Sequence, residues 1–173
     1  MQATVPNNTA KPAYFAHFVI KTSKYEQAVA WYKPFLQAEI VFANARATFL
    51  TYDDEHHRIA IVNQPGLEPV ETPHAGIDHV AYSLSSLRDL AINFVRLKAL
   101  GIEPYWSINH GPTTSMYYRD PDGNRIELQV DNWSEPGRTR AYFQTPEFAA
   151  NPLGVEFDPA AFCREHLATV DRS

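Results

Sequence analysis

YYRDPDGNRIELQVDN, residues 117–132, contains two strands joined by a tight turn. The central Asp-Pro-Asp-Gly-Asn segment is turn chemistry between two apolar runs. The second strand alternates, so that one predicted face is apolar and the other is polar: Ile126, Leu128 and Val130 against Arg125, Glu127 and Gln129. Glu127 therefore lies in the middle of a strand, where the desolvation of an unpaired charge is expensive. This carboxylate requires a partner.

The chain also contains an internal repeat. Residues 16–40 (AHFVIKTSKYEQAVAWYKPFLQAEI) align with residues 78–104 (DHVAYSLSSLRDLAINFVRLKALGIEP) at an offset of 62, which places His17 over His79. Each copy begins as a short apolar strand and continues as a helix. Repetition at this length indicates two copies of one supersecondary unit.

Start and stop signals locate the two helices. Ser23 with Glu26 in the first copy, and Ser86 with Asp89 in the second, predict capping boxes. Pro34 is expected to kink or end the first helix, and Gly101 to end the second.

Both copies finish as strand pairs. The first pair is ATFLTYDDEHHRIAIVN and the second is TSMYYRDPDGNRIELQV, which places Ala60 over Glu127 after about five extra residues. We therefore predict an α+β fold of two βαβββ modules in one domain, with a curved mixed sheet. The expected boundaries are a flexible segment at 1–12, a domain at 13–131 with modules at about 13–63 and 76–131, and an extension at 132–173 with a short final helix.

Composition narrows the class of protein. The 173 residues are 45% hydrophobic and 20% charged, as in an ordinary globular protein, and the net charge of −5 argues against nucleic acid as a partner. A single cysteine, Cys163, leaves no intramolecular disulfide. We expect a cytoplasmic protein with no membrane association, because the N-terminus resembles no signal peptide and no apolar run reaches spanning length.

The repeat suggests how Glu127 is paired. His17 and His79 occupy equivalent places in the first strands, and Glu127 lies on the last strand of the second module. Two imidazoles and one carboxylate on one face of a metal form the facial triad of non-haem Fe(II) oxygenases. Ala60, where a fourth ligand would lie by symmetry, favours a three-ligand site.

Simpler interpretations remain open for each residue. A strand histidine is more often hydrogen-bonded than metal-bound, and Glu127 could instead pair with Arg125 or another cation. For His74 in the proline-containing linker, and for His166 and Cys163 in the final helix, we expect no chemical role.

The segments AHFVIKT, DHVAYSL and DPDGNRIELQVD, in this order and spacing, resemble the vicinal oxygen chelate superfamily over about residues 13–131. Within it, YDDEHHRIAIVN resembles the His-His-x-x-Ala stretch of type I extradiol ring-cleaving dioxygenases. The resemblance implies that His57 is the catalytic acid/base and that Tyr117 hydrogen-bonds the substrate. Because residue 122 is the midpoint of the turn, Tyr117 and Glu127 are expected side by side.

One position departs from that pattern. The family places another histidine nine residues before the tyrosine, whereas His110 is seven before Tyr117, which puts its role in question. Regular alternation would place His57 and Ala60 on opposite faces of a strand. For both side chains to face the same way, either a bulge must lie between them or the strand must begin there. Four aromatic residues are candidates for a substrate wall or for plain core: Trp31, Phe49, Tyr118 and Trp106.

The resemblance implies an Fe(II) enzyme, with Mn(II) possible, whose partners are an aromatic diol and O₂. The diol would bind the metal through two adjacent oxygens, and O₂ would take the remaining position. Small members of the superfamily commonly pair, so we expect a homodimer or higher homo-oligomer. Two alternatives remain: a metal-dependent isomerase or thiol transferase of the glyoxalase or fosfomycin-resistance type, and a metal-free small-molecule-binding module.

Overall fold

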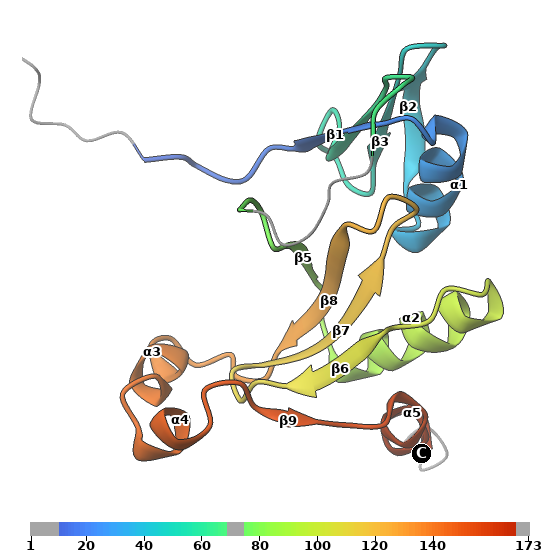
Figure 1. Ribbon diagram of the computed structural model, residues 1–173. Helices are drawn as coiled ribbons and strands as arrows, with labels where there is room; N and C mark the ends of the chain where they lie inside the picture. Colours follow the sequence, from blue (N-terminus) through green and yellow to red (C-terminus); the bar gives the residue numbers. More distant parts are fainter. Residues whose placement is uncertain (1–10, 69–74, 169–173) are drawn as a thin grey trace, which may run out of the picture. The chain divides into compact units, whose positions relative to one another are not determined.

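The computed structural model describes residues 11–68 and 75–168, and the chain divides into two compact units, residues 1–67 and 68–173 (Figure 1). Part of the expected N-terminal segment, two of the linker prolines, Pro69 and Pro73, and His74 lie outside the described residues. In the described part of the chain, no helix has the length and apolar character needed to cross a membrane.

The first unit is one βαβββ module. Its elements are β1 (Phe18–Thr22), α1 (Tyr25–Phe35), β2 (Glu39–Ala43), β3 (Ala47–Thr51) and β4 (Ile59–Asn63). The sheet order is β1-β4-β3-β2, with β1 parallel to β4 and the other pairs antiparallel. The buried side of this sheet packs on α1. Tyr32 and Phe35 of the helix and Leu50, Ile59 and Ile61 of the sheet form most of this core.

The second unit repeats this module and adds to it. Its elements are β5 (His79–Ser83), α2 (Leu87–Ala99), β6 (Trp106–Asn109), β7 (Thr113–Arg119) and β8 (Arg125–Asp131), followed by α3 (Arg138–Tyr142), α4 (Pro146–Ala150), β9 (Val155–Glu156) and α5 (Pro159–Leu167). The sheet order is β5-β8-β7-β6-β9, and β5 is parallel to β8. The α+β class and the βαβββ order of both modules are confirmed.

Strand pairing establishes the equivalence of the two modules. Val19 of β1 pairs with Ala60 of β4, and Ala81 of β5 pairs with Glu127 of β8. Val19 and Ala81 are 62 positions apart, whereas Ala60 and Glu127 are 67 apart, so five extra residues precede the second hairpin, as predicted. Ala60 therefore occupies in its sheet the place that Glu127 occupies in the other.

The hairpin of β7 and β8 has the predicted register. Tyr117 pairs directly with Glu127. In the turn, the Asp120 carboxylate accepts hydrogen bonds from the backbone N–H groups of Asp122 and Asn124, and Gly123 has a φ of +87°. A left-handed residue at this position favours glycine, which explains why the turn sequence forms a tight hairpin.

Three of the four predicted helix start and stop signals are confirmed. The Ser86 hydroxyl accepts a hydrogen bond from the backbone N–H of Asp89 and caps α2, which ends before Gly101 at φ +74°. Pro34 lies in the last turn of α1, which ends at Phe35. The capping box at Ser23 is wrong, because α1 begins after Lys24 and the Ser23 hydroxyl donates instead to the carbonyl of Leu67.

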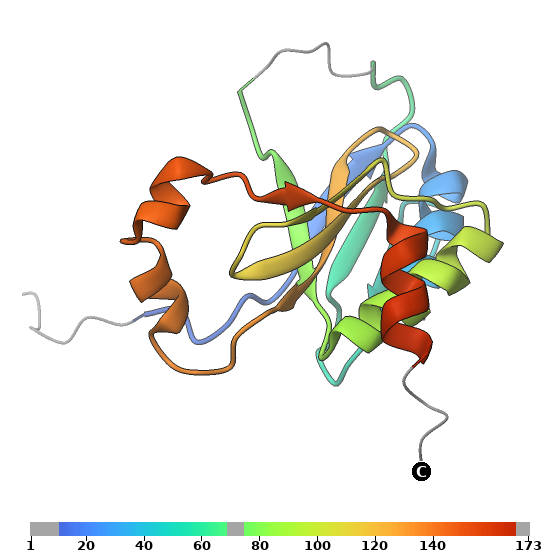
Figure 2. The ribbon, with the colours of Figure 1, turned by 90° about the horizontal axis from the view of Figure 1, so that it is seen from below.

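The C-terminal extension is more structured than a single final helix. It contributes β9, which pairs with β6 and becomes the fifth strand of the second sheet. Asp158 caps α5 by accepting from the N–H groups of Ala160 and Ala161. Helix α5 packs beside α2, where the Cys163 thiol donates to the Ala91 carbonyl (Figure 2). Cys163 is buried and has a packing role, as expected.

Candidate metal and catalytic site

One face of the second sheet carries the polar residues singled out in the sequence. Alternation along β8 directs Ile126 and Leu128 to the buried side with α2 and leaves Glu127 on the opposite face. Cross-strand pairing adds Tyr117 of β7 beside Glu127 and Trp106 of β6 beside Tyr117. The sheet thereby aligns one carboxylate, one phenol and one indole in a row.

Glu127 is buried with 4% of its surface exposed, and its partner is a histidine. The Glu127 Oε2 atom lies 3.0 Å from Nε2 of His79 on the neighbouring strand. Arg125 donates to Asp78 at 2.7 Å, and within residues 11–68 and 75–168 it forms no ion pair with Glu127. The interpretation of Glu127 as a partner of Arg125 is therefore not the one the structure adopts.

The other ring nitrogen of His79 is also held. Its Nδ1 lies 2.8 Å from Oδ2 of Asp78, and this hydrogen bond, with nearby Arg125, keeps the pKa of the Asp78 carboxyl below its ordinary value. A carboxylate that accepts the Nδ1 proton of a histidine leaves Nε2 free to bind a metal. Sequence reasoning did not identify Asp78, although its position directly before a candidate ligand was a signal.

His110 reaches Tyr117 despite its unusual spacing. The His110 Nε2 atom lies 3.1 Å from the Tyr117 hydroxyl, and its Nδ1 lies 2.6 Å from the Leu153 carbonyl. Because a carbonyl can only accept, Nδ1 of His110 carries a proton, and Nε2 is the ring nitrogen that faces the Tyr117 hydroxyl. Burial, followed by the Glu127 carboxylate, raises the pKa of Tyr117 well above its ordinary value.

The C-terminal extension supports this side of the sheet. Besides the Leu153 carbonyl, it supplies Glu156, which accepts from the indole N–H of Trp106 at 2.7 Å. Trp106 packs on Tyr117 with a ring-centroid distance of 4.8 Å. Sequence reasoning missed both contributions, and the backbone carbonyl had no residue-type signal that could have identified it.

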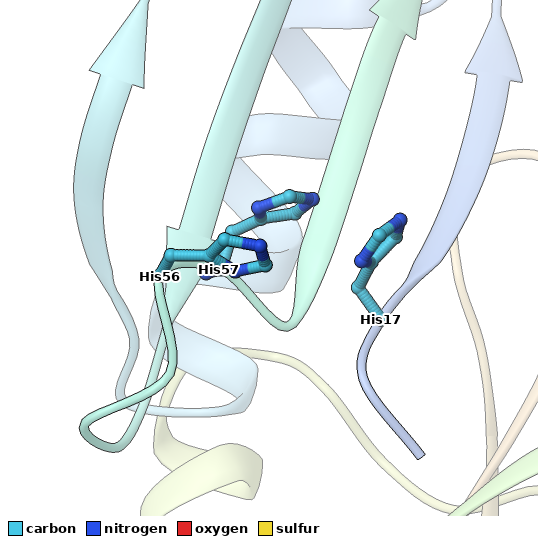
Figure 3. Close-up of side chains that lie close together, drawn as sticks. All are labelled: His17, His56 and His57. Carbon is cyan, nitrogen blue, oxygen red and sulfur yellow. Dashed lines mark hydrogen bonds between the residues drawn. The ribbon is translucent and has the colours of Figure 1, made fainter. Parts of the chain in front are cut away.

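The first unit gathers three imidazoles. One ring nitrogen from each of His17, His56 and His57 lies within 4.8 Å of the other two (Figure 3). The rings of His17 and His57 have centroids 4.2 Å apart, and Phe49 stacks on His57 at 4.8 Å. Burial, followed by the rings of His17 and His56, lowers the pKa of His57.

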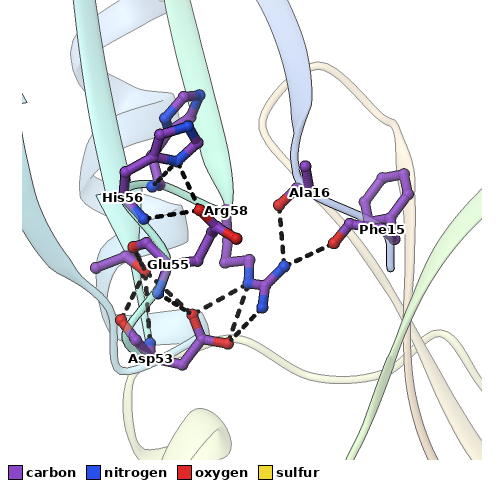
Figure 4. A network of polar contacts seen from close by, with 8 residues as sticks. Phe15, Ala16, Asp53, Glu55, His56 and Arg58 are labelled. Atoms are coloured by element: carbon purple, nitrogen blue, oxygen red, sulfur yellow. Dashed lines mark hydrogen bonds and ion pairs between the residues drawn. The ribbon is translucent and has the colours of Figure 1, made fainter. Parts of the chain in front are cut away.

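A guanidinium joins the segments that carry these histidines. Arg58 donates to the carbonyls of Phe15 at 2.6 Å and Ala16 at 3.0 Å, directly before His17 (Figure 4). Its other nitrogens bind the Asp53 carboxylate at 2.9–3.0 Å. Arg58 therefore fixes the approach to β1 against the loop that precedes β4. Strand β4 begins at Ile59, so His57 lies before the strand. Strand alternation therefore does not force His57 and Ala60 onto opposite faces.

The four aromatic candidates divide into two pairs. Phe49 contacts His57 and Trp106 contacts Tyr117, so both lie against candidate site residues. Tyr118 is fully buried on the face of β7 opposite Tyr117. Trp31 stacks on Phe35 of the same helix at 4.2 Å. Tyr118 therefore belongs to the core of the second unit, and the substrate-wall interpretation is wrong for it. Trp31 is half-buried against its own helix.

Each unit thus contains part of the predicted constellation. His17 and His57 lie together in the first unit, with His56 beside them. His79, Glu127, Tyr117 and His110 form a continuous set of contacts in the second. In the final helix, the His166 ring packs on Phe162 at 4.3 Å, consistent with a structural residue.

The chain is similar to known proteins in sequence and in fold. The profile of the Glyoxalase/Bleomycin resistance protein/Dioxygenase superfamily matches residues 14–128. Biphenyl-2,3-diol 1,2-dioxygenase 2 of Rhodococcus globerulus is 47% identical over 87% of this chain and 80% of its own length, and biphenyl-2,3-diol 1,2-dioxygenase 3 of the same organism is 40% identical over 91% and 84%. A glyoxalase/dioxygenase from Nostoc punctiforme shares the fold, with a TM-score of 0.61 at 14% identity over 75% of this chain and all of that one.

Proposed function

The chain belongs to the glyoxalase/bleomycin resistance protein/dioxygenase superfamily, and from this premise we propose that it is an extradiol dioxygenase that inserts O₂ into an aromatic diol of the biphenyl-2,3-diol type. The observation that carries the proposal is its similarity, at 40–47% identity over most of both chains, to two biphenyl-2,3-diol 1,2-dioxygenases. The contacts of Glu127, Tyr117 and His110 support it, because they provide a carboxylate and a phenol-imidazole pair on one face of a sheet.

We propose His17, His79 and Glu127 as the ligands of Fe(II), with Mn(II) as the alternative metal. The second unit fits this assignment, because a buried carboxylate oxygen and an imidazole nitrogen lie 3.0 Å apart. Asp78 would hold His79 in the tautomer that ligates through Nε2. Two imidazoles and one carboxylate are the donor set of non-haem Fe(II) oxygenases. When bound, the metal supplies electron transfer between the diol and O₂.

The protein residues supply orientation and proton transfer. Tyr117, whose hydroxyl is held by His110, is positioned to hydrogen-bond a diol oxygen, and Trp106 provides an aromatic surface next to it. The Leu153 carbonyl keeps the proton of His110 on Nδ1. His57 acts as the acid/base, and its lowered pKa keeps the ring neutral and able to accept a proton near pH 7.

Oxygen consumption tests the proposed reaction. The chain is loaded with Fe(II) under anaerobic conditions and offered biphenyl-2,3-diol, catechol and a fused-ring diol. We expect uptake of one O₂ per diol and a yellow ring-opened product from at least one of them. If no diol causes O₂ uptake but a glutathione hemithioacetal is isomerised, the isomerase alternative replaces the dioxygenase.

We further propose that the protein acts in the cytoplasm as a homodimer or higher oligomer. The support for association is in the first sheet, where the edge strand β2 exposes 41–46% of each of three apolar side chains: Ile40, Val41 and Phe42. An apolar edge strand can be covered by a symmetric copy of itself.

A further inference from the structure

The three-histidine cluster contains one residue that the proposed reaction does not use. His17 is a proposed iron ligand and His57 the proposed acid/base, whereas His56 has neither role. Nevertheless, one ring nitrogen of His56 lies within 4.8 Å of a ring nitrogen on each of the other two. All three histidines belong to the first unit, so their arrangement does not depend on any residue of the second.

The spacing suits a small divalent cation. Zn²⁺ binds imidazole nitrogen at about 2.0–2.1 Å in tetrahedral geometry, which corresponds to a nitrogen-nitrogen separation of about 3.4 Å. The widest pair of nitrogens would therefore move closer by at most about 1.4 Å, since all lie within 4.8 Å. His17 and His56 have exposed side chains, and their rotation toward the half-buried His57 would produce such a change.

Glu55 can orient His56 as a ligand. Its Oε1 lies 3.0 Å from Nδ1 of His56 and also accepts the His56 backbone N–H at 3.1 Å, which holds the carboxylate in place. When Nδ1 donates to Glu55, Nε2 is free to bind a metal. The backbone N–H of His57 lies 2.9 Å from the same Nδ1 and would bond to it only in the opposite tautomer. A metal bound at Nε2 requires the tautomer with the proton on Nδ1, which is the one that donates to Glu55.

The backbone around the cluster is also held in place. Arg58 links the carbonyls of Phe15 and Ala16 to the Asp53 carboxylate, so the residues before His17 and the loop before His57 are tied together. Preorganised ligands cost less ordering entropy when a cation binds.

We propose that His17, His56 and His57 form a binding site for Zn²⁺ that shares His17 with the iron-binding set. Three imidazoles with water as the fourth ligand is a zinc donor set, whereas the two-histidine-one-carboxylate set is typical of Fe(II). Zn²⁺ is generally bound more tightly than Fe²⁺ by a given nitrogen site. Occupancy by Zn²⁺ withdraws His17 and His57 from the dioxygenase, so zinc inhibits it. The binding is independent of the proposed function, and only the inhibition rests on it.

Zinc binding to the metal-free full-length chain tests the site. The His79→Gln variant removes the iron-binding set but leaves the three-histidine cluster intact, and it is compared with the double variant His79→Gln/His56→Gln. We expect His79→Gln to bind one Zn²⁺ per chain. The double variant should bind at least about tenfold more weakly, because loss of even an outer-shell partner of a ligand typically costs about 10- to 100-fold in affinity. With Co²⁺ as the probe, only His79→Gln should give the intense visible absorption of a tetrahedral ion.

Two results would overturn the site: equal zinc affinity in the single and double variants, or the absence of zinc binding by a folded His79→Gln chain. Circular dichroism establishes folding, and His56 is an exposed side chain whose replacement should not affect it. Zinc inhibition of O₂ uptake in the iron-loaded wild type and in His56→Gln is measured separately, each relative to its own zinc-free rate. If the wild type shows no O₂ uptake, the proposed function fails while the zinc titration still decides the site.

Discussion

At the scale of single residues, the neighbouring histidines His56 and His57 have different environments. His57 stacks on Phe49 and lies against His17, and burial lowers its pKa. His56 has a 65% exposed side chain whose nearest acidic partner is Glu55 at 3.0 Å. The two residues are adjacent in sequence, so substitutions at them form a matched comparison of a proposed catalytic group with an exposed one.

We predict that His57→Phe binds iron and diol but loses ring cleavage by about 100- to 10,000-fold, because a positioned proton-transfer group contributes that much to a rate. His56→Phe is expected to retain the wild-type rate in zinc-free buffer. Mixing an anaerobic enzyme-diol complex with O₂ in a single turnover isolates the chemical step. A His57→Phe chain that reacts as fast as wild type would refute the acid/base role.

At the scale of elements, the two helix starts provide a second matched comparison. Ser86 caps α2 through Asp89, whereas Ser23 makes no such bond to α1. We predict that Ser86→Ala lowers the free energy of unfolding by about 1 kcal/mol, the usual cost of a lost N-cap. Ser23→Ala should change it by less than about 0.5 kcal/mol. Urea denaturation measures both, and equal losses would contradict the capping assignment.

The approach of the tail to β6 depends on one glycine. Gly154 has a φ of +109°, and a Cβ atom there would collide with the Asn109 carbonyl oxygen. Gly137 has a φ of +82° with nothing within 4 Å of the same position, so it serves as the control. Both alanine variants carry the conformational cost of a side chain at positive φ, but only in Gly154→Ala does the added Cβ atom collide with backbone atoms.

We predict that Gly154→Ala lowers the free energy of unfolding by about 1–3 kcal/mol more than Gly137→Ala, the usual cost of overpacking. The collision should also displace the Leu153 carbonyl from His110 and reduce diol cleavage. Urea denaturation and O₂ uptake on both variants check this. Equal stability and equal activity would show that β9 is not needed at this edge.

The sequence predicted these elements unevenly, for physical reasons. The hairpin of β7 and β8 was predictable because turn chemistry and alternation are local, and its register followed from the turn's midpoint. The two modules were predictable from the repeat. Strand β9 has two residues and depends on pairing with β6, a nonlocal contact with no local pattern. The same limit applies to the site. Asp78 could have been found from its position directly before His79, but the Leu153 carbonyl could not, because a backbone group has no residue-type signal.

At the scale of the whole molecule, the exposed apolar edge of β2 predicts association. We expect sedimentation at micromolar concentration to give a mass of at least two chains of 19.6 kDa. Phe42→Lys should shift the distribution toward the monomer, because a charged residue on an edge strand opposes pairing. A wild-type protein that sediments only as a monomer would refute the predicted association.

The proposed metal set draws His17 from the first unit and His79 and Glu127 from the second. The most direct test of this central claim is the iron bound per chain after anaerobic Fe(II) loading and desalting. We predict about one iron in the wild type and in His56→Ala, and a loss of bound iron in His17→Ala, His79→Ala and Glu127→Ala. Full iron content in any one of these three variants would contradict the ligand assignment.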